Sequence, residues 1–240
     1  MEVRYLPADG GEVVTDLTRA RAQDIVYGRP IRDFAWHPKM THYPGWFWSA
    51  TMEDLVGYES LLERDWLLLA DFDPNVVAIA NQPFGLCGRD GSRIRHHVPD
   101  FLFCERDGSV VVVDVKPSEF VDKPKVAEVF EWTSRLLSER GWRYEVWTGG
   151  DPVQLTNLSF LRQGKRWDMV QPRAVENLLR SGSVGMTLGA AVTGATTMDT
   201  GPVEVRAALL ALLWHQVWVV ELDTPLSDGT TITGIRQGAA

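Results

Sequence analysis

The sequence predicts an α/β protein, and three observations carry this expectation. A stripe of apolar side chains at helical spacing runs through residues 52–72. Segments typical of strands follow it, of which Val110–Val115 is almost wholly apolar, as expected for a strand buried on both faces. A second helix over residues 123–140, closed by Gly141, then precedes a further strand at Tyr144–Trp147.

The first helix is expected to begin near Thr51, because Thr51 and Asp54 resemble a capping pair. Leu62 and Trp66 continue its apolar stripe at a spacing of one helical turn. The helix is expected to end at Asp73, because a residue that precedes proline disfavours helical backbone angles.

The strands that follow are expected at residues 76–80, 100–103 and 110–115. Between the last two lies Asp107-Gly108, a strong signal for a tight turn between antiparallel strands. A turn centred on Asp107 places Asp100 directly opposite Asp114.

The chain is expected to contain three parts: an irregular arm over residues 1–50, an α/β domain over 51–155, and a smaller domain over 156–240. Gly149-Gly150-Asp151-Pro152 suggests the boundary between the last two. In the third part the sequence predicts helices at 172–180 and 202–214, then strands at 217–222 and 230–235. Helices followed by a β-hairpin predict a small winged-helix-like domain.

Composition narrows the class of protein. Of the 240 residues, 45% are hydrophobic and 23% are charged, which is ordinary for a soluble globular chain. No apolar run approaches the ~18 residues that span a bilayer, and the start of the chain lacks the pattern of a signal peptide. We therefore expect a cytoplasmic protein with no membrane partner. Two cysteines exclude a metal site made of four cysteines of one chain.

The net charge of −8 argues against DNA binding by overall electrostatic attraction, but it leaves room for a local basic groove. The candidates for DNA contacts form two weak clusters, for each of which a solvated loop is the alternative interpretation. They are Arg93, Arg95 and His97 before the predicted site, and Lys165 and Arg166 after the α/β domain.

The strongest chemical signal joins Pro99-Asp100 with Asp114-Val115-Lys116. Side chains alternate along a strand, so Asp114 and Lys116 share a face, and Asp100 joins them from the opposite strand. Two opposed carboxylates on a mostly buried sheet are unfavourable unless a cation lies between them. This is the pattern of the PD-(D/E)xK restriction-endonuclease-like core, a mixed sheet flanked by helices.

Mg²⁺ suits this pattern because it prefers oxygen ligands, and we expect Mn²⁺ to substitute for it. The expected ligands are Glu63, from the preceding helix, with Asp100 and Asp114. Glu59 is the alternative helix carboxylate, one turn earlier. Lys116 is expected to orient the attacking water and to offset charge on the phosphate.

Further residues resemble a known family. Tyr58–Asp65, Leu67–Val76 and Asn81-Gln82-Pro83, together with the segments around Asp100 and Asp114, resemble the N-terminal nuclease domain of TnsA, over about residues 45–150. TnsA is the endonuclease subunit of heteromeric cut-and-paste transposons.

The resemblance implies a metal-dependent endonuclease that cuts the 5′ ends of the element. It also implies a TnsB-like DDE transposase and a TnsC-like AAA+ ATPase as partners, besides the DNA of the transposon ends. By position, Glu63, Asp100 and Lys116 match the carboxylates and the lysine of that family. Asp114 stands where the family can have glutamine.

Two other functions stay open at this point. The first is another PD-(D/E)xK nuclease, of the restriction or defence type, which the same four residues would serve equally well. The second is a catalytically idle assembly subunit of a transposition complex, against which the intact set of Glu63, Asp100, Asp114 and Lys116 argues.

Overall fold

The chain divides into two compact units, Met1–Gly149 and Gly150–Ala240. The computed structural model describes residues 1–32 and 43–236. The division lies at Gly149-Gly150, inside the segment that suggested the boundary, and before residue 155. Asp151 and Pro152 begin α5: the Asp151 side chain accepts a hydrogen bond from the Gln154 N–H, and Pro152 is the first residue of the helix. Among the described residues, no helix has both the length and the apolar character needed to cross a membrane.

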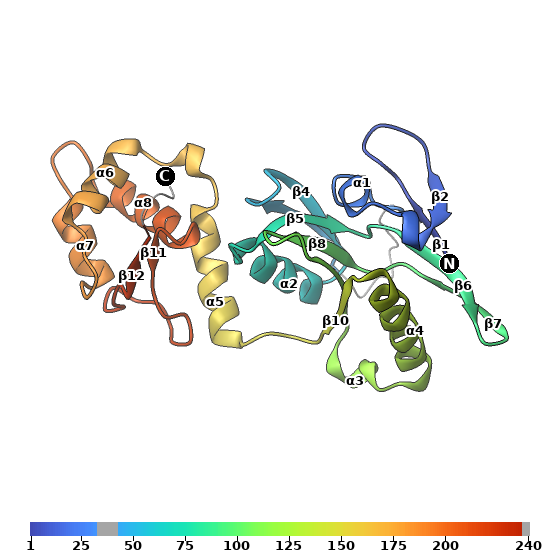
Figure 1. The fold of residues 1–240 in the computed structure, drawn as a ribbon. Helices are drawn as coiled ribbons and strands as arrows, with labels where there is room; N and C mark the ends of the chain where they lie inside the picture. Colours follow the sequence, from blue (N-terminus) through green and yellow to red (C-terminus); the bar gives the residue numbers. More distant parts are fainter. Residues whose placement is uncertain (33–42, 237–240) are drawn as a thin grey trace. The chain divides into compact units, whose positions relative to one another are not determined.

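The first unit is built around a mixed sheet, which confirms the predicted α/β class (Figure 1). Its strand order is β10-β9-β8-β5. Neighbouring strands are antiparallel except for β9 and β10, which are parallel. The strands are β5 (Val76–Asn81), β8 (Phe101–Glu105), β9 (Val110–Val115) and β10 (Arg143–Trp147).

The register of β8 and β9 is the one that the Asp107-Gly108 turn predicts. Phe101 lies opposite Val113, and Cys104 opposite Val110. In the turn, the Asp107 side chain accepts a hydrogen bond from the Ser109 N–H, and Gly108 has a φ of +89°, which favours glycine. The residues that precede β8 therefore meet the last residues of β9.

Helices cover both faces of this sheet. On one face, Trp66 of α2 (Leu61–Phe72) stacks on Phe101, with ring centroids 4.4 Å apart. On the other face, Trp132 of α4 (Pro124–Arg140) shares a buried cluster with Leu102 and Val112. The short helix α3 (Ser118–Val121) precedes α4, and Gly141, at a φ of +79°, ends α4 as predicted.

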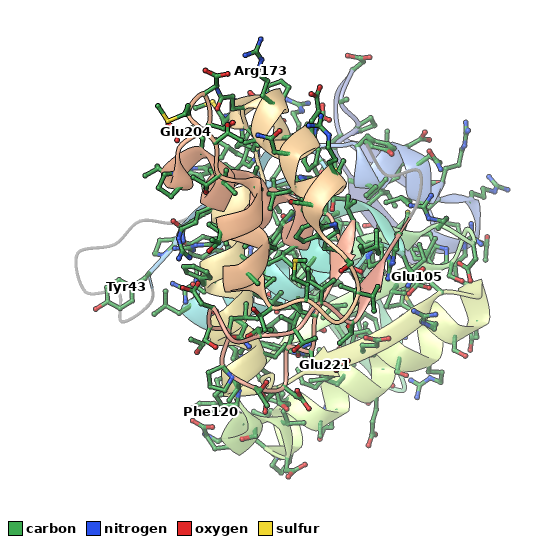
Figure 2. The ribbon with its side chains drawn as sticks, turned by 90° about the vertical axis from the view of Figure 1, so that its left-hand side faces the viewer. Tyr43, Glu105, Phe120, Arg173, Glu204 and Glu221 are labelled. Carbon is green, nitrogen blue, oxygen red and sulfur yellow. The ribbon has the colours of Figure 1, made fainter. Side chains whose placement is uncertain are left out.

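The far end of the sheet, away from Asp100, is fixed by an ion pair across three strands. Glu105, which is labelled in Figure 2, ends β8. Its carboxylate accepts a hydrogen bond of 2.6 Å from Arg143 at the start of β10. The strand β9 lies between them. This contact joins β8 to β10 across β9.

The predicted helix over residues 52–72 is wrong in its first half. Residues Gly45–Ser49 and Asp54–Tyr58 instead form a hairpin, β3 and β4. The Thr51 N–H donates to Asp71, and so does the Ser49 hydroxyl, at 2.9 and 2.6 Å. The carboxylate of Asp71 on α2 therefore stabilises the hairpin turn, so Thr51 does not cap a helix.

The N-terminal residues are not an irregular arm. They contribute β1 (Glu2–Tyr5) and β2 (Val13–Asp16) to a second sheet of order β2-β1-β6-β7, with β6 (Gly85–Asp90) and β7 (Arg93–His97). A 3-10 turn (Leu17–Arg19) and α1 (Ala22–Val26) follow β2. Val3 is completely buried and lies opposite Leu86 of β6. Residues 33–42 of the predicted arm lie outside the described residues.

The second unit is mainly helical. It contains α5 (Pro152–Leu161), two 3-10 turns (Arg162–Gly164 and Trp167–Met169), α6 (Pro172–Ser181), α7 (Leu188–Ala195) and α8 (Pro202–Trp214). The helices predicted at 172–180 and 202–214 are confirmed as α6 and α8.

The two strands predicted near the C-terminus are much shorter than expected. They comprise Trp218–Val219 (β11) and Gly234–Ile235 (β12), paired antiparallel. Two sets of contacts limit them. The buried Asn157 amide of α5 donates to the carbonyls of Leu222 and Thr224 and accepts from the Leu226 N–H, so the chain leaves the ladder at Leu222. Residues 230–232 bond instead to residues 185–188: the Leu188 N–H donates to the Thr230 carbonyl, and the Ile232 N–H donates to the Met186 carbonyl.

Because Val3 of β1 is buried, a substitution there can test whether the N-terminal residues form a packed strand. Val3→Asp would bury an unpaired carboxylate, and we expect it to lower the free energy of unfolding by more than about 3 kcal/mol. Val14→Asp on β2 is the matched control, because Val14 is 55% exposed, and it should cost less than about 1 kcal/mol. Equal urea midpoints for the two variants would contradict this packing.

Candidate active site

Asp100 and Asp114 come together at one end of the central sheet, as the sequence predicts. Asp100 directly precedes β8, and its Oδ2 accepts a hydrogen bond of 2.7 Å from the Val115 N–H of β9. The chain turns away before β8 begins, so this carboxylate takes the place of a backbone acceptor beside Val115. Hydrogen bonding to a strand fixes Asp100 beside the last residues of β9.

Asp100 is a buried carboxyl group close to other acidic side chains. Burial raises the pKa of Asp100 well above its usual range, and the negative charges of Asp114 and then Glu63 raise it further. The hydrogen bond from Val115 opposes this shift. Strong perturbation by burial and like charge is common at functional sites.

Asp114 is held more tightly than the sequence suggests. It is only 3% exposed, and its Oδ2 lies 2.7 Å from His97 Nε2. The Tyr144 hydroxyl donates to the same oxygen. His97 was predicted as a weak DNA contact, whereas here it reaches the carboxylate from the end of β7. Tyr144 was not recognised as a site residue.

Lys116 follows Asp114 by two residues, just beyond β9. Its N–H donates to the Trp147 carbonyl at 2.9 Å, which extends the pairing of β9 with β10 by one residue. Because side chains alternate along an extended chain, Lys116 leaves the same face as Asp114.

Glu63 helps to cap α2 at Ser60, whereas the sequence predicted a cap at Thr51. It lies in the first turn of α2, where the Ser60 Oγ accepts from the Glu63 N–H. In return, the Glu63 carboxylate accepts from the Glu59 N–H and from the Ser60 hydroxyl, at 2.7 and 2.9 Å. This is a capping box. Burial raises the pKa of Glu63 as well.

Glu59, the alternative helix carboxylate, lies one residue before the helix cap and pairs with Arg32 at 3.1 Å. Both glutamates contribute to the raised pKa of Asp100, Glu63 more than Glu59. The start of α2 thus adds negative charge near Asp100.

Gln82 lies directly behind Asp100. Its N–H donates to the Asp100 carbonyl at 2.7 Å, and its own carbonyl accepts from the Ile31 N–H. The backbone of Gln82 has a φ of +43°, and its buried Oε1 has no hydrogen-bond partner among the described residues. Strained backbone of this kind persists where surrounding structure imposes it, often at functional sites. Here the backbone hydrogen bonds of Gln82 hold the Asp100 backbone in position.

The donor chemistry fits a hard cation in part. Carboxylate oxygens are the ligands that Mg²⁺ prefers, and it commonly takes one or two from the protein and the rest from water and phosphate. Within residues 1–32 and 43–236, no three acidic, histidine or cysteine side chains are arranged as a complete metal site. The pair Asp100 and Asp114 therefore offers a partial ligand set.

The arginines predicted to contact DNA before the site are already paired with acids. Arg95 donates to Asp90 at 2.6 Å and to Glu128 of α4 at 2.8 Å, and Arg93 donates to Glu128 at 3.3 Å. Arg135 of α4 also donates to Asp90. These ion pairs hold the β6–β7 hairpin against α4 and offset the positive charge that would attract phosphate.

The two basic residues predicted in the second unit are also engaged. Lys165 is 8% exposed, and its ammonium lies 4.8 Å from the centre of the Trp214 ring. Arg166 donates to both oxygens of Asp168, at 2.9 and 2.7 Å. In this arrangement Lys165 does not present its charge to a DNA surface.

Comparison with known proteins now adds to this geometry. Residues 73–149 match the family model described as TnsA-like endonuclease N terminal. This part of the chain is similar to the N-terminal domain of TnsA-like endonucleases. No curated protein matches the chain.

The matched span of this TnsA-like domain contains Asp100, Asp114 and Lys116, together with His97 and Tyr144. It does not reach α2, so the roles expected for Glu59 and Glu63 stay predictions. The four strands of the central sheet all lie within the match.

The raised pKa of Asp100 makes a prediction about stability. A carboxyl whose pKa is raised by folding keeps a proton that the unfolded chain has lost, so stability falls as pH rises through this window. We therefore expect Asp100→Asn to raise the Tm at pH 7 in EDTA by at least about 2 °C, which corresponds to ~1 kcal/mol for a domain of this size. Asparagine keeps an acceptor for the Val115 N–H.

The control is Asp122→Asn, which changes an exposed carboxyl and should leave the Tm within error of wild type. The difference between Asp100→Asn and wild type should shrink as the pH falls to about 4, because wild-type Asp100 is then protonated. A lower Tm for Asp100→Asn at pH 7 would contradict the electrostatic account.

Proposed function

We propose that this chain is the metal-dependent endonuclease subunit of a cut-and-paste transposase, which hydrolyses phosphodiester bonds at the 5′ ends of the element. The observation that carries the proposal is the pairing of Asp100 with Asp114, at the ends of adjacent strands, inside the span that matches a TnsA-like endonuclease. Such a pair favours a divalent cation, and cations of this kind serve phosphodiester hydrolysis.

In this proposal the core is of the PD-(D/E)xK type, and Asp100 and Asp114 would hold Mg²⁺ or Mn²⁺. When bound, the ion would acidify a coordinated water and stabilise the leaving 3′ oxygen. Glu63 would complete the ligand set or act through its charge alone. Lys116 would orient the attacking water and balance charge that develops on the phosphate.

The charge of the chain favours recruitment by partners over independent DNA binding. The chain carries a net charge of −8, and Arg93 and Arg95 are neutralised by Glu128 and Asp90. Non-specific DNA binding depends on unpaired positive charge and on released counterions. A TnsB-like DDE transposase would therefore bring the transposon ends to the site, with a TnsC-like AAA+ ATPase as regulator.

The second unit would dock these partners as a winged-helix-like domain. Its element order supports this: α6 is followed by a bridge residue, Thr187, then by α7, α8 and the short pair β11 and β12. Thr187 pairs antiparallel with Thr231, which precedes β12. A helix, a short strand, two helices and a paired β-ribbon follow one another in this order in winged helices.

The test is cleavage of transposon-end DNA by the full chain together with its cognate transposase. Lys116→Ala should lower the rate of 5′-strand cleavage about 10²- to 10³-fold, because it removes a positive charge beside the reacting phosphate. Cleavage of the 3′ strand by the transposase should persist. Lys125→Ala on α4 is the matched control, an exposed lysine that should leave both rates unchanged.

Equal 5′-strand cleavage by wild type and Lys116→Ala would overturn the proposed chemistry. Cleavage that needs neither transposon ends nor transposase would instead favour a restriction or defence nuclease. Mg²⁺ and Mn²⁺ should both support 5′ cleavage, and EDTA should abolish it.

A further inference from the structure

The buried carboxylate of Asp114 is clamped through one oxygen. Oδ2 lies 2.7 Å from His97 Nε2, and the Tyr144 hydroxyl donates to the same atom. Among the described residues, neither donor nor any other group bonds to Oδ1. The side chain is 5% exposed, yet Oδ1 is not among the fully buried side-chain atoms that lack a partner, so a small ligand can reach it. One oxygen of Asp114 is therefore saturated and the other is left for a further ligand.

The two donors come from elements that pack independently. Tyr144 lies on β10, opposite Val112, which is two residues before Asp114 on β9 and therefore on the same face. His97 ends β7, the edge strand of the second sheet. Because the contacts arrive from two different sheets, they restrict both the position of the carboxylate and its rotation about χ2.

Each donor is held in turn by its surroundings. The Phe130 ring of α4 packs against the Tyr144 ring, with centroids 6.3 Å apart. Arg95, two residues before His97, joins β7 to α4 through Glu128. A tyrosine hydroxyl keeps its proton at neutral pH, so Tyr144 remains a donor to Asp114.

We propose that Tyr144 and His97 are positioning residues that aim Oδ1 of Asp114 at the divalent cation. This inference rests on the proposed function, because it assumes that Asp114 is a metal ligand. Hydrogen bonds that orient a ligating carboxylate from behind are general in metal sites, and their loss weakens metal affinity about 10- to 100-fold. A tyrosine hydroxyl cannot neutralise the carboxylate, so it orients Asp114 while leaving its charge available to a cation.

The arrangement also explains why His97 and His96 have different neighbours. Adjacent residues on a strand point to opposite faces, and His96 Nε2 accordingly lies 3.9 Å from Cys87 Sγ, away from Asp114. The pair His96 and His97 thus offers a matched comparison on one strand. Tyr5 of β1, buried at 5% exposure, offers the same for Tyr144.

The experiment measures Mn²⁺ affinity of the full chain by electron paramagnetic resonance, with Tm recorded for every variant. Tyr144→Phe and His97→Leu should each weaken Mn²⁺ binding about 10- to 100-fold. His97→Gln should restore most of the affinity, because the glutamine amide can donate from nearly the same position. Tyr5→Phe and His96→Leu should bind Mn²⁺ as wild type does.

Cleavage kinetics provide the second readout. In the presence of the transposase, Tyr144→Phe should raise the Mn²⁺ concentration needed for half-maximal 5′ cleavage, while the rate at saturating Mn²⁺ stays within about threefold of wild type. A merely structural role would instead lower the Tm and reduce the amount of active protein without moving the metal dependence.

Failure of this inference differs from failure of the proposed function. If wild type binds Mn²⁺, Asp100→Asn abolishes binding and Tyr144→Phe and His97→Leu bind as wild type does, the positioning role is overturned and the metal site stands. If wild type does not bind Mn²⁺ even with transposase and DNA present, both are overturned.

Discussion

The structure of the site depends on two carboxylates that meet, largely buried, at the end of a pair of strands. Burial and mutual repulsion raise the pKa of Asp100, which means that the metal-free fold carries an electrostatic cost there. A protein keeps such a pair only where the rest of the fold holds it in place. The tight turn at Gly108, the sheet register and the Asp100 bond to Val115 do so here.

The support for this pair extends beyond the central sheet. β6 and β7 join the N-terminal strands in a second sheet, and β7 delivers His97 to Asp114. The burial of Val3 therefore supports this contact, because it stabilises the sheet that carries His97. Arg93 and Arg95 of β7 form ion pairs with Glu128 of α4. Their charge therefore stabilises the β6–β7 hairpin more than it attracts DNA.

Glu63 is both the glutamate of a capping box and a proposed metal ligand. Its carboxylate closes the first turn of α2, and its negative charge also reaches Asp100. Both roles suit a carboxylate at a helix N-terminus, where the helix dipole favours negative charge. The same carboxylate can fill both roles. Glu63 therefore stabilises the start of α2 whether or not a cation is bound.

The sequence by itself determined where the central strands lie along the chain, the Asp107-Gly108 turn and the register that brings Asp100 opposite Asp114, because these follow from local periodicity and turn chemistry. It did not determine the spatial order of the strands in the sheet or the hairpin at 45–58, where Asp71 accepts hydrogen bonds from the turn around Thr51. Nor did it determine the shortness of the C-terminal strands, which are limited by contacts with Asn157 and with residues 185–188. The roles of His97 and Tyr144 were also decided by tertiary structure. Their contacts with Asp114 join residues 17 and 30 positions away in the chain, and no local pattern encodes a contact that depends on how two sheets pack.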